Sequence, residues 1–113
     1  MVTPKIRQGD VVKINFDPYI GHEQSGYRPA VVVSNRLSHG WISVVFLCPV
    51  THTDRKNPFH HKLNGYDFVD GFVLCDQIKS MDLAAREYHV IGHLRDQDIL
   101  EIIEKIEMLI EVE

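Results

Sequence analysis

The stretch Tyr27-Arg28-Pro29-Ala30-Val31-Val32-Val33-Ser34 carries the strongest indication of the fold. Its segment 30–34 is a run of mostly β-branched residues, which is typical of a buried strand. The segment before it, residues 19–27, holds two glycines and mostly polar residues, so we expect a surface loop there. Arg28 and Pro29 therefore lie where this loop enters the strand.

Further strand-like segments lie on both sides of this run. Each is short, contains β-branched or aromatic residues, and is bounded by residues that favour turns. The segments are 11–16, 41–47, 59–63, 71–78 continuing into 79–83, and a last short strand toward Tyr88 and Ile91. Ser38-His39-Gly40 and Asn64-Gly65 are the turns that we expect between neighbouring strands.

The C-terminal part of the chain predicts one amphipathic helix. Its apolar residues recur at helical spacing: Ile99, Ile102, Ile103, Ile106, Leu109 and Ile110. Asp96 is a candidate N-cap, and Asp98 lies near the positive end of the helix dipole. Six or so short strands followed by one helix indicate a mainly antiparallel β-barrel with the helix packed on it.

Length and composition favour one ordered globular domain over residues 1–113. The chain is 44% hydrophobic and 25% charged, as in ordinary globular proteins. Its apolar runs fall short of the roughly 20 residues that a membrane span needs, and residues 1–9 lack the pattern of a secretion signal. Cys48 and Cys75 lie inside apolar runs, where we expect free, buried thiols. These features favour the cytoplasm.

Charge is divided unevenly along the chain. Residues 96–113 hold seven acids and one base, a charge of −6, whereas residues 1–95 hold eleven bases and nine acids, a charge of +2. A total of −4 argues against nucleic-acid binding, because phosphate neutralisation draws on a basic surface. If the C-terminal helix faces away from a nucleic acid, the rest of the protein still offers a mild positive excess.

Three histidines, His52, His60 and His61, suggest a metal site at first sight. Adjacent His60 and His61 would point to opposite faces of a strand, however, and no pattern of cysteines or carboxylates completes a tetrahedral set. We therefore expect no metal ion.

Several motifs follow one another in a specific order. They are Gly9-Asp10-Val11-Val12, Asp17-Pro18, Gly21-His22-Glu23-Gln24, Gly26 with the stretch quoted above, Cys48-Pro49-Val50-Thr51, and Asp76-Gln77-Ile78-Lys79-Ser80. Together they resemble the MazF/PemK family of toxins from type II toxin–antitoxin systems, over nearly the whole chain. The resemblance implies an SH3-like antiparallel β-barrel of the MazF/PemK and CcdB kind, with a C-terminal helix, that acts as a homodimer.

In that family the activity is sequence-specific, metal-independent cleavage of single-stranded mRNA, an mRNA interferase activity that needs no cofactor. The 2′-hydroxyl attacks the adjacent phosphorus, which leaves a 2′,3′-cyclic phosphate and a 5′-hydroxyl. Carried onto this sequence, the resemblance implies catalytic roles for Arg28 and Thr51, with Glu23 in support. A guanidinium can contact a phosphate with two donors, and a threonine hydroxyl can donate to another phosphate oxygen. Without the resemblance, Arg28 would be an ordinary surface arginine and Thr51 a turn residue.

The sequence does not decide which residues transfer the protons. An arginine side chain keeps its proton at any ordinary pH, so Glu23 or His22 is the alternative, with His22 also interpreted as a solvated residue near the RNA. The loops 19–27 and 51–57 would flank the cleavage site. The RNA-binding candidates are His22, Gln24, Thr53, Lys56, Asp76 and Gln77, of which Asp76 and Gln77 could read the base edges of unpaired nucleotides.

Two other functions compete with the nuclease. One is a non-catalytic toxin on a similar barrel that poisons a topoisomerase, and the other is an RNA-binding module in which Arg28 only anchors phosphate. The pairing of Arg28 with Thr51 favours the nuclease. The resemblance also implies a cognate antitoxin, a separate chain whose acidic tail competes with RNA and which binds DNA together with the toxin.

Overall fold

The computed structural model describes residues 5–16 and 27–113. Its strands are β1 (Asp10–Asn15), β2 (Tyr27–Val32), β3 (Val45–Thr51), β4 (His60–Leu63), β5 (Gly71–Leu74), β6 (Lys79–Met81) and β7 (Tyr88–His93). Its helices are α1 (Arg36–His39), the short 3₁₀ helix η2 (Leu83–Ala85) and α2 (Asp96–Ile110). Among these helices none is long and apolar enough to cross a membrane.

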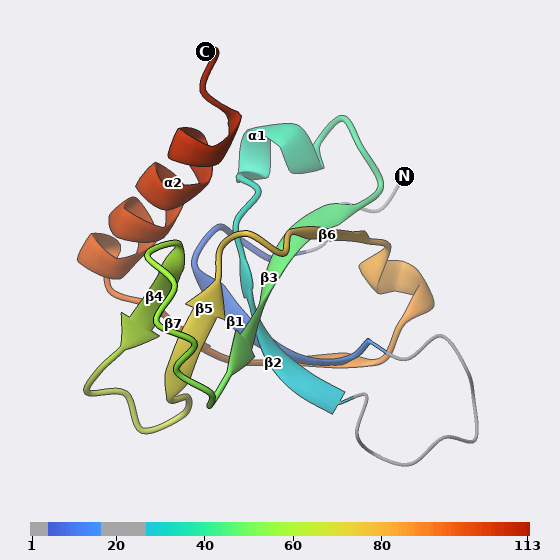
Figure 1. The fold of residues 1–113 in the computed structure, drawn as a ribbon. Helices are drawn as coiled ribbons and strands as arrows, with labels where there is room; N and C mark the ends of the chain where they lie inside the picture. The colour runs from blue at the N-terminus through green and yellow to red at the C-terminus, as the bar shows by residue number, and fades with distance from the viewer. Residues whose placement is uncertain (1–4, 17–26) are drawn as a thin grey trace.

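The strands form one curved antiparallel sheet in the order β4-β5-β3-β2-β1-β7 (Figure 1). β3 is shared between two partners on one side: its first half pairs with β6, and its end, Val50 and Thr51, pairs with β5. Within the described residues the path of hydrogen bonds stays open between β4 and β7. The prediction of a mainly antiparallel β fold with a C-terminal helix is confirmed.

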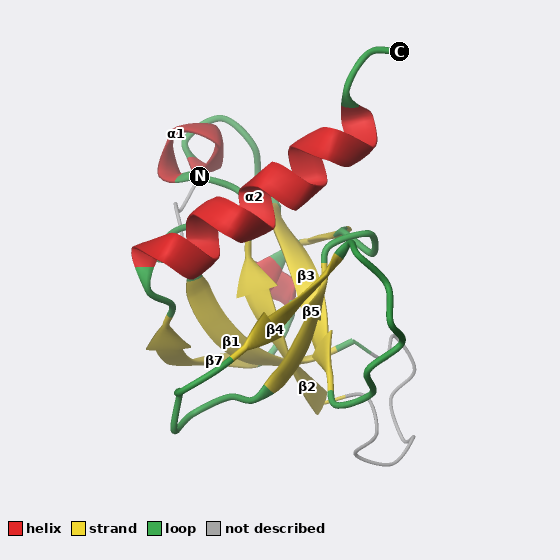
Figure 2. Ribbon diagram, turned by 60° about the vertical axis from the view of Figure 1, so that its left-hand side comes forward, coloured by secondary structure: helices red, strands yellow, loops and turns green. Residues whose placement is uncertain are grey.

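Alternating side chains of the strands build a separate core on each face of the sheet. The α2-side core gathers residues such as Val11, Val31, Cys48, Val73 and Ile102. The β6-side core gathers their strand neighbours, such as Val12, Ala30, Val32, Leu47 and Met81. Figure 2 shows α2 crossing one side of the sheet, where Ile102 and Ile106 are its buried residues. The two thiols predicted to be buried, Cys48 and Cys75, are both fully covered.

Three predicted strands have the wrong bounds. The strand expected at 30–34 is β2, which begins already at Tyr27 and ends at Val32. The strand expected at 41–47 begins only at Val45, because Trp41 and Ile42 belong to the connection after α1, where Trp41 is 83% exposed. The strand expected at 71–78 ends at Leu74, because Gln77 closes a turn by donating its backbone N–H to the Leu74 carbonyl. The chain then resumes as β6 beside the other half of β3.

The two helix starts also differ from expectation. Residues 36–39 form α1, capped by Asn35, whose side chain accepts the backbone N–H of Ser38, where only a turn was expected. The N-cap of α2 is Arg95, without a side-chain cap, so the prediction of Asp96 as the N-cap is wrong by one residue. Asp98 does lie in the first turn of α2, as predicted, and its carboxylate has partners described below.

Candidate functional site

Arg28 and Thr51 lie at the same end of the β2–β3 strand pair. The pairing runs from Val32 opposite Leu47 to Ala30 opposite Pro49. Arg28 lies two residues before Ala30 in the chain, and Thr51 lies two residues after Pro49, so both lie just beyond this last pair. Beyond this point the two strands diverge (Figure 1). Arg28 is exposed, and Thr51 is partly buried. The two side chains therefore flank the opening end of the strand pair.

Strand alternation puts both residues on the face of the sheet away from α2. Arg28 shares its face with Ala30 and Val32, and Thr51 shares its face with Leu47. Those three neighbours belong to the β6-side core. The acidic helix α2 covers the opposite face, so the negative charge of residues 96–113 lies on the far side of the sheet from Arg28 and Thr51.

The neighbourhood of Thr51 restricts how its hydroxyl is used. Its oxygen Oγ1 accepts the backbone N–H of Thr53 at 3.3 Å, so the hydroxyl hydrogen remains for donation to another group. The backbone carbonyl of Thr51 packs against Gly71, whose φ is +115°, and a Cβ at position 71 would overlap this carbonyl oxygen. Glycine at 71 thus allows β5 to approach Thr51 closely.

Thr51 is also the first residue of a row that crosses three strands. Phe72 on β5 is directly opposite Thr51 on β3, and Lys62 on β4 is directly opposite Phe72. The Lys62 ammonium lies 5.5 Å from the centroid of the Phe72 ring. No signal in the sequence places Phe72 and Lys62 beside Thr51, because alternation shows which residues share a strand face but not which strands are neighbours.

Two long-range hydrogen bonds hold the chain on either side of residues 17–26. The Tyr27 hydroxyl donates to Glu87 at 2.6 Å, and the Arg86 guanidinium donates to the Asn15 carbonyl at 2.9 Å. The hydrogen bond to Glu87 is also the largest reason that the pKa of Tyr27 is raised. The candidates His22, Glu23 and Gln24 lie outside the described residues, but their flanking strands are anchored next to Arg28.

Thr53 and Lys56 follow Thr51 in an exposed connection to β4. Lys56 has a φ of 54° and donates to Asp54 from its backbone and from its ammonium, at 2.9 and 3.0 Å. The backbone bond and then the ammonium bond lower the pKa of Asp54. Part of the positive charge of Lys56 is therefore balanced by its own loop.

Asp76 and Gln77 are not brought next to Thr51 within one chain. Asp76 comes four residues after Phe72, roughly 13 Å of extended chain, past the other end of β5. The Asp76 carboxylate is bonded to His60, with 3.1 Å between its Oδ1 and Nε2, and the His60 side chain is only 4% exposed. Of the RNA-binding candidates that the structure describes, Thr53 and Lys56 are the ones near Thr51 in the chain.

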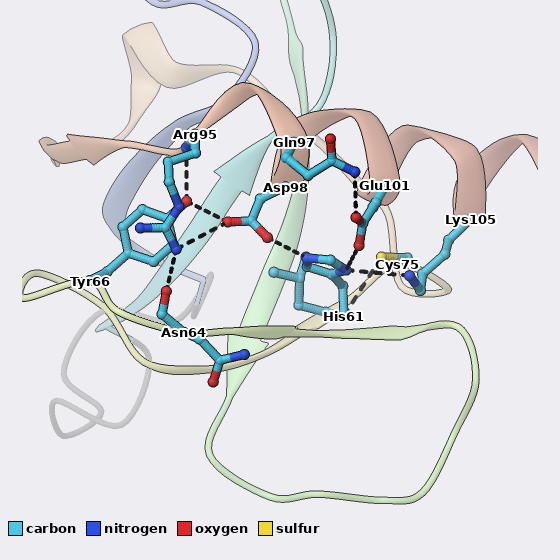
Figure 3. A network of polar contacts seen from close by, with 10 residues as sticks. His61, Asn64, Tyr66, Cys75, Arg95, Gln97, Asp98, Glu101 and Lys105 are labelled. Carbon is cyan, nitrogen blue, oxygen red and sulfur yellow. Dashed lines mark hydrogen bonds and ion pairs between the residues drawn. The ribbon is translucent and has the colours of Figure 1, made fainter.

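His61 points to the opposite face from His60, as predicted. Its Nε2 lies 2.7 Å from Asp98 on α2, and the same carboxylate accepts the Tyr66 hydroxyl at 2.5 Å (Figure 3). Lys105 reaches the other ring nitrogen of His61 at 3.3 Å. This network fastens α2 to β4 and lies on the far side of the sheet from Thr51. In the described part of the chain no three His, Cys, Asp or Glu residues gather as metal ligands.

Comparison with known proteins finds one matching family and close structural likeness. The family described as "PemK-like, MazF-like toxin of type II toxin-antitoxin system" matches residues 7–110. The endoribonuclease toxin MazF of Escherichia coli K12 is 35% identical over 102 residues, which cover 90% of this chain and 91% of that protein.

Two solved structures from Deinococcus radiodurans resemble the fold over 99% of this chain and 100% of theirs. Crystal-form I of MazF has a TM-score of 0.80 at 31% identity. Crystal-form III of MazE-MazF has a TM-score of 0.82 at 28% identity. The fold of this chain is thus similar to that of solved MazF structures along nearly its whole length.

Proposed function

The chain belongs to the family of PemK-like, MazF-like toxins of type II toxin-antitoxin systems, and from this we propose that it is an endoribonuclease toxin. It cleaves single-stranded mRNA at specific sequences in the cytoplasm without a metal ion. The products carry a 2′,3′-cyclic phosphate and a 5′-hydroxyl. The support from relatives is that the similar protein of Escherichia coli is named an endoribonuclease toxin.

The observation that carries the proposal is the position of Arg28 and Thr51. Both are on the face of the sheet away from α2, at the end of the β2–β3 pair where the strands diverge. A phosphate between the two strand ends would meet the guanidinium from one side and the Thr51 hydroxyl from the other. Charge that develops on the phosphate oxygens would thereby be stabilised from fixed positions on two strands.

Proton transfer needs a group that changes its protonation state more easily than an arginine does. We assign this role to Glu23, in the segment that leads into β2, because a carboxylate can accept the proton of the attacking 2′-hydroxyl. His22 and Gln24 contact the RNA from the same segment, and Thr53 and Lys56 contact it from the connection after Thr51. Asp76 and Gln77 read bases further along the strand of RNA.

Two protein partners belong to the proposal. The chain forms a homodimer, which is supported by three exposed apolar side chains on α1 and the connection after it: Leu37, Trp41 and Ile42, with exposed fractions of 78%, 83% and 36%. A separate antitoxin inhibits the toxin, in line with the solved MazE-MazF structures that this fold resembles. Light scattering of the purified chain tests the dimer, and a Trp41→Ser variant should shift it toward the monomer.

The first experiment is incubation of the purified protein with a long single-stranded RNA in excess EDTA. Arg28→Ala is run beside it, and Arg36→Ala, which replaces an exposed arginine on α1, is the matched control. We expect discrete cuts with cyclic-phosphate ends for the wild type and the control, and none for Arg28→Ala. Intact RNA in every lane would refute the nuclease and favour a toxin that poisons a protein target or a module that only binds RNA.

A further inference from the structure

Phe72 is an aromatic residue that belongs to neither core. The two cores are made of named sets of side chains from both faces of the sheet, and Phe72 is in neither of them. Its neighbour Val73 is fully buried on the α2 side, so alternation directs the Phe72 ring to the other face. The ring is partly exposed there.

The position of this ring relative to Thr51 follows from the strand register. Residues directly opposite each other on antiparallel strands have Cβ atoms about 4.5–5.5 Å apart and side chains on the same face. Phe72 stands in this relation to Thr51 on one side and to Lys62 on the other. The ring is therefore within the reach of one nucleotide from the Thr51 hydroxyl.

Lys62 places a positive charge next to the Phe72 ring. Its ammonium lies 5.5 Å from the ring centroid, at the distance of a cation–π contact, and its side chain is exposed. Proteins that bind single-stranded nucleic acids combine such positive groups with aromatic rings on which unpaired bases stack.

We propose that Phe72 and Lys62 form a base-stacking subsite for the unpaired nucleotide next to the phosphate held by Arg28 and Thr51. The base stacks on the ring of Phe72 in place of the Lys62 ammonium, which moves from the ring to the adjoining phosphate. A purine overlaps the ring more fully than a pyrimidine does, so the subsite favours a purine at this position. This inference rests on the proposed nuclease function, because it takes the RNA path to pass over Thr51.

The test uses an RNA spanning one mapped cleavage site, with a 2′-deoxyribose at the cleaved position to prevent the reaction. 2-Aminopurine replaces the base on one side of the scissile phosphate or on the other, and its fluorescence falls when it stacks on a ring. We expect the wild type to quench one of the two probes. Phe72→Leu should abolish this quenching and weaken binding about 5-fold or more, while Phe72→Trp should retain both.

Two further variants separate stacking from general effects. Phe46→Leu is the matched control, since Phe46 is a 40% exposed phenylalanine near the other end of β3 and should leave quenching unchanged. Lys62→Gln should retain quenching but reduce the slope of log affinity against log salt by about 0.7, the value for one phosphate contact on a single strand. Thermal melting of each variant verifies that it is folded.

The outcomes distinguish this subsite from the nuclease proposal. If the wild type cuts RNA but quenches neither probe, or if folded Phe72→Leu quenches the same probe as strongly as the wild type does, the subsite is refuted and the nuclease stands. If the wild type cuts nothing, the nuclease is refuted. The same probes are then placed in a random single-stranded RNA, and the subsite is refuted unless the wild type quenches them and Phe72→Leu does not.

Discussion

Replacing Asp98 by asparagine tests how α2 is fastened to the sheet. Asp98 is 16% exposed and accepts hydrogen bonds from the Tyr66 hydroxyl and from His61, at 2.5 and 2.7 Å. A hydrogen bond to a charged group contributes about 1.5–3 kcal/mol. Asparagine retains one oxygen and turns an N–H toward the other donor, so Asp98→Asn should lower the free energy of unfolding by about 2 kcal/mol at pH 7.

The same change has a defined pH dependence. Burial, the largest single influence, raises the pKa of Asp98, but the hydrogen bonds from Tyr66 and His61 and the charges of His61 and Arg95 together lower it below its ordinary value. A lowered pKa in the folded protein means that the carboxylate stabilises the fold above about pH 4 and ceases to do so as the pH falls through the folded pKa. The difference between wild type and Asp98→Asn should therefore narrow as the pH is lowered from 7 to 3.

The assay is urea unfolding at pH 7, 5 and 3, at one protein concentration because a dimer would make the midpoint depend on concentration. Asp96→Asn is the control, since it removes an exposed carboxylate from the same first turn of α2 and should cost under about 1 kcal/mol. Equal losses in the two variants, or a difference for Asp98→Asn that stays constant down to pH 3, would refute the reasoning.

Three further results are expected. Gly71→Ala should lower the free energy of unfolding by about 2 kcal/mol or more and reduce RNA cleavage, because φ at 71 is +115° and the new Cβ would overlap the Thr51 carbonyl. A variant with the urea midpoint and the activity of the wild type would contradict this. Burial raises the pKa of Cys48 to about 12 and that of Cys75 to about 11. Iodoacetamide at about pH 8 should therefore label both thiols only after the protein is unfolded, which mass spectrometry of the labelled protein would detect. Arg28→Lys should reduce kcat/KM on RNA about 10- to 100-fold while an uncleavable RNA still binds within a few-fold, since lysine keeps the charge but loses the two-pronged contact; full activity would count against the catalytic role.

Local sequence patterns predicted most elements and missed some of their bounds. The spacing of Ile102 and Ile106 predicted α2, and the β-branched run at 30–34 predicted the strand that follows the loop. Trp41 and Ile42 misled the interpretation, because an apolar residue looks the same in sequence whether it is buried or exposed. The turn after Leu74 was missed because its backbone hydrogen bond needs no glycine or proline.

The candidate site likewise has a part that the sequence could predict and a part that it could not. Arg28 and Thr51 were selected as candidates through a resemblance carried by short motifs, and alternation along β2 and β3 is enough to assign each a strand face. The sequence alone determined these local properties, because the side chains of a strand alternate with a period of two whatever its partners are. Only the tertiary structure decided that Thr51, Phe72 and Lys62 form one row and that the acidic α2 covers the other face. The physical reason is that strand neighbours are chosen by burial and hydrogen bonding between segments far apart in the chain, which no local pattern records.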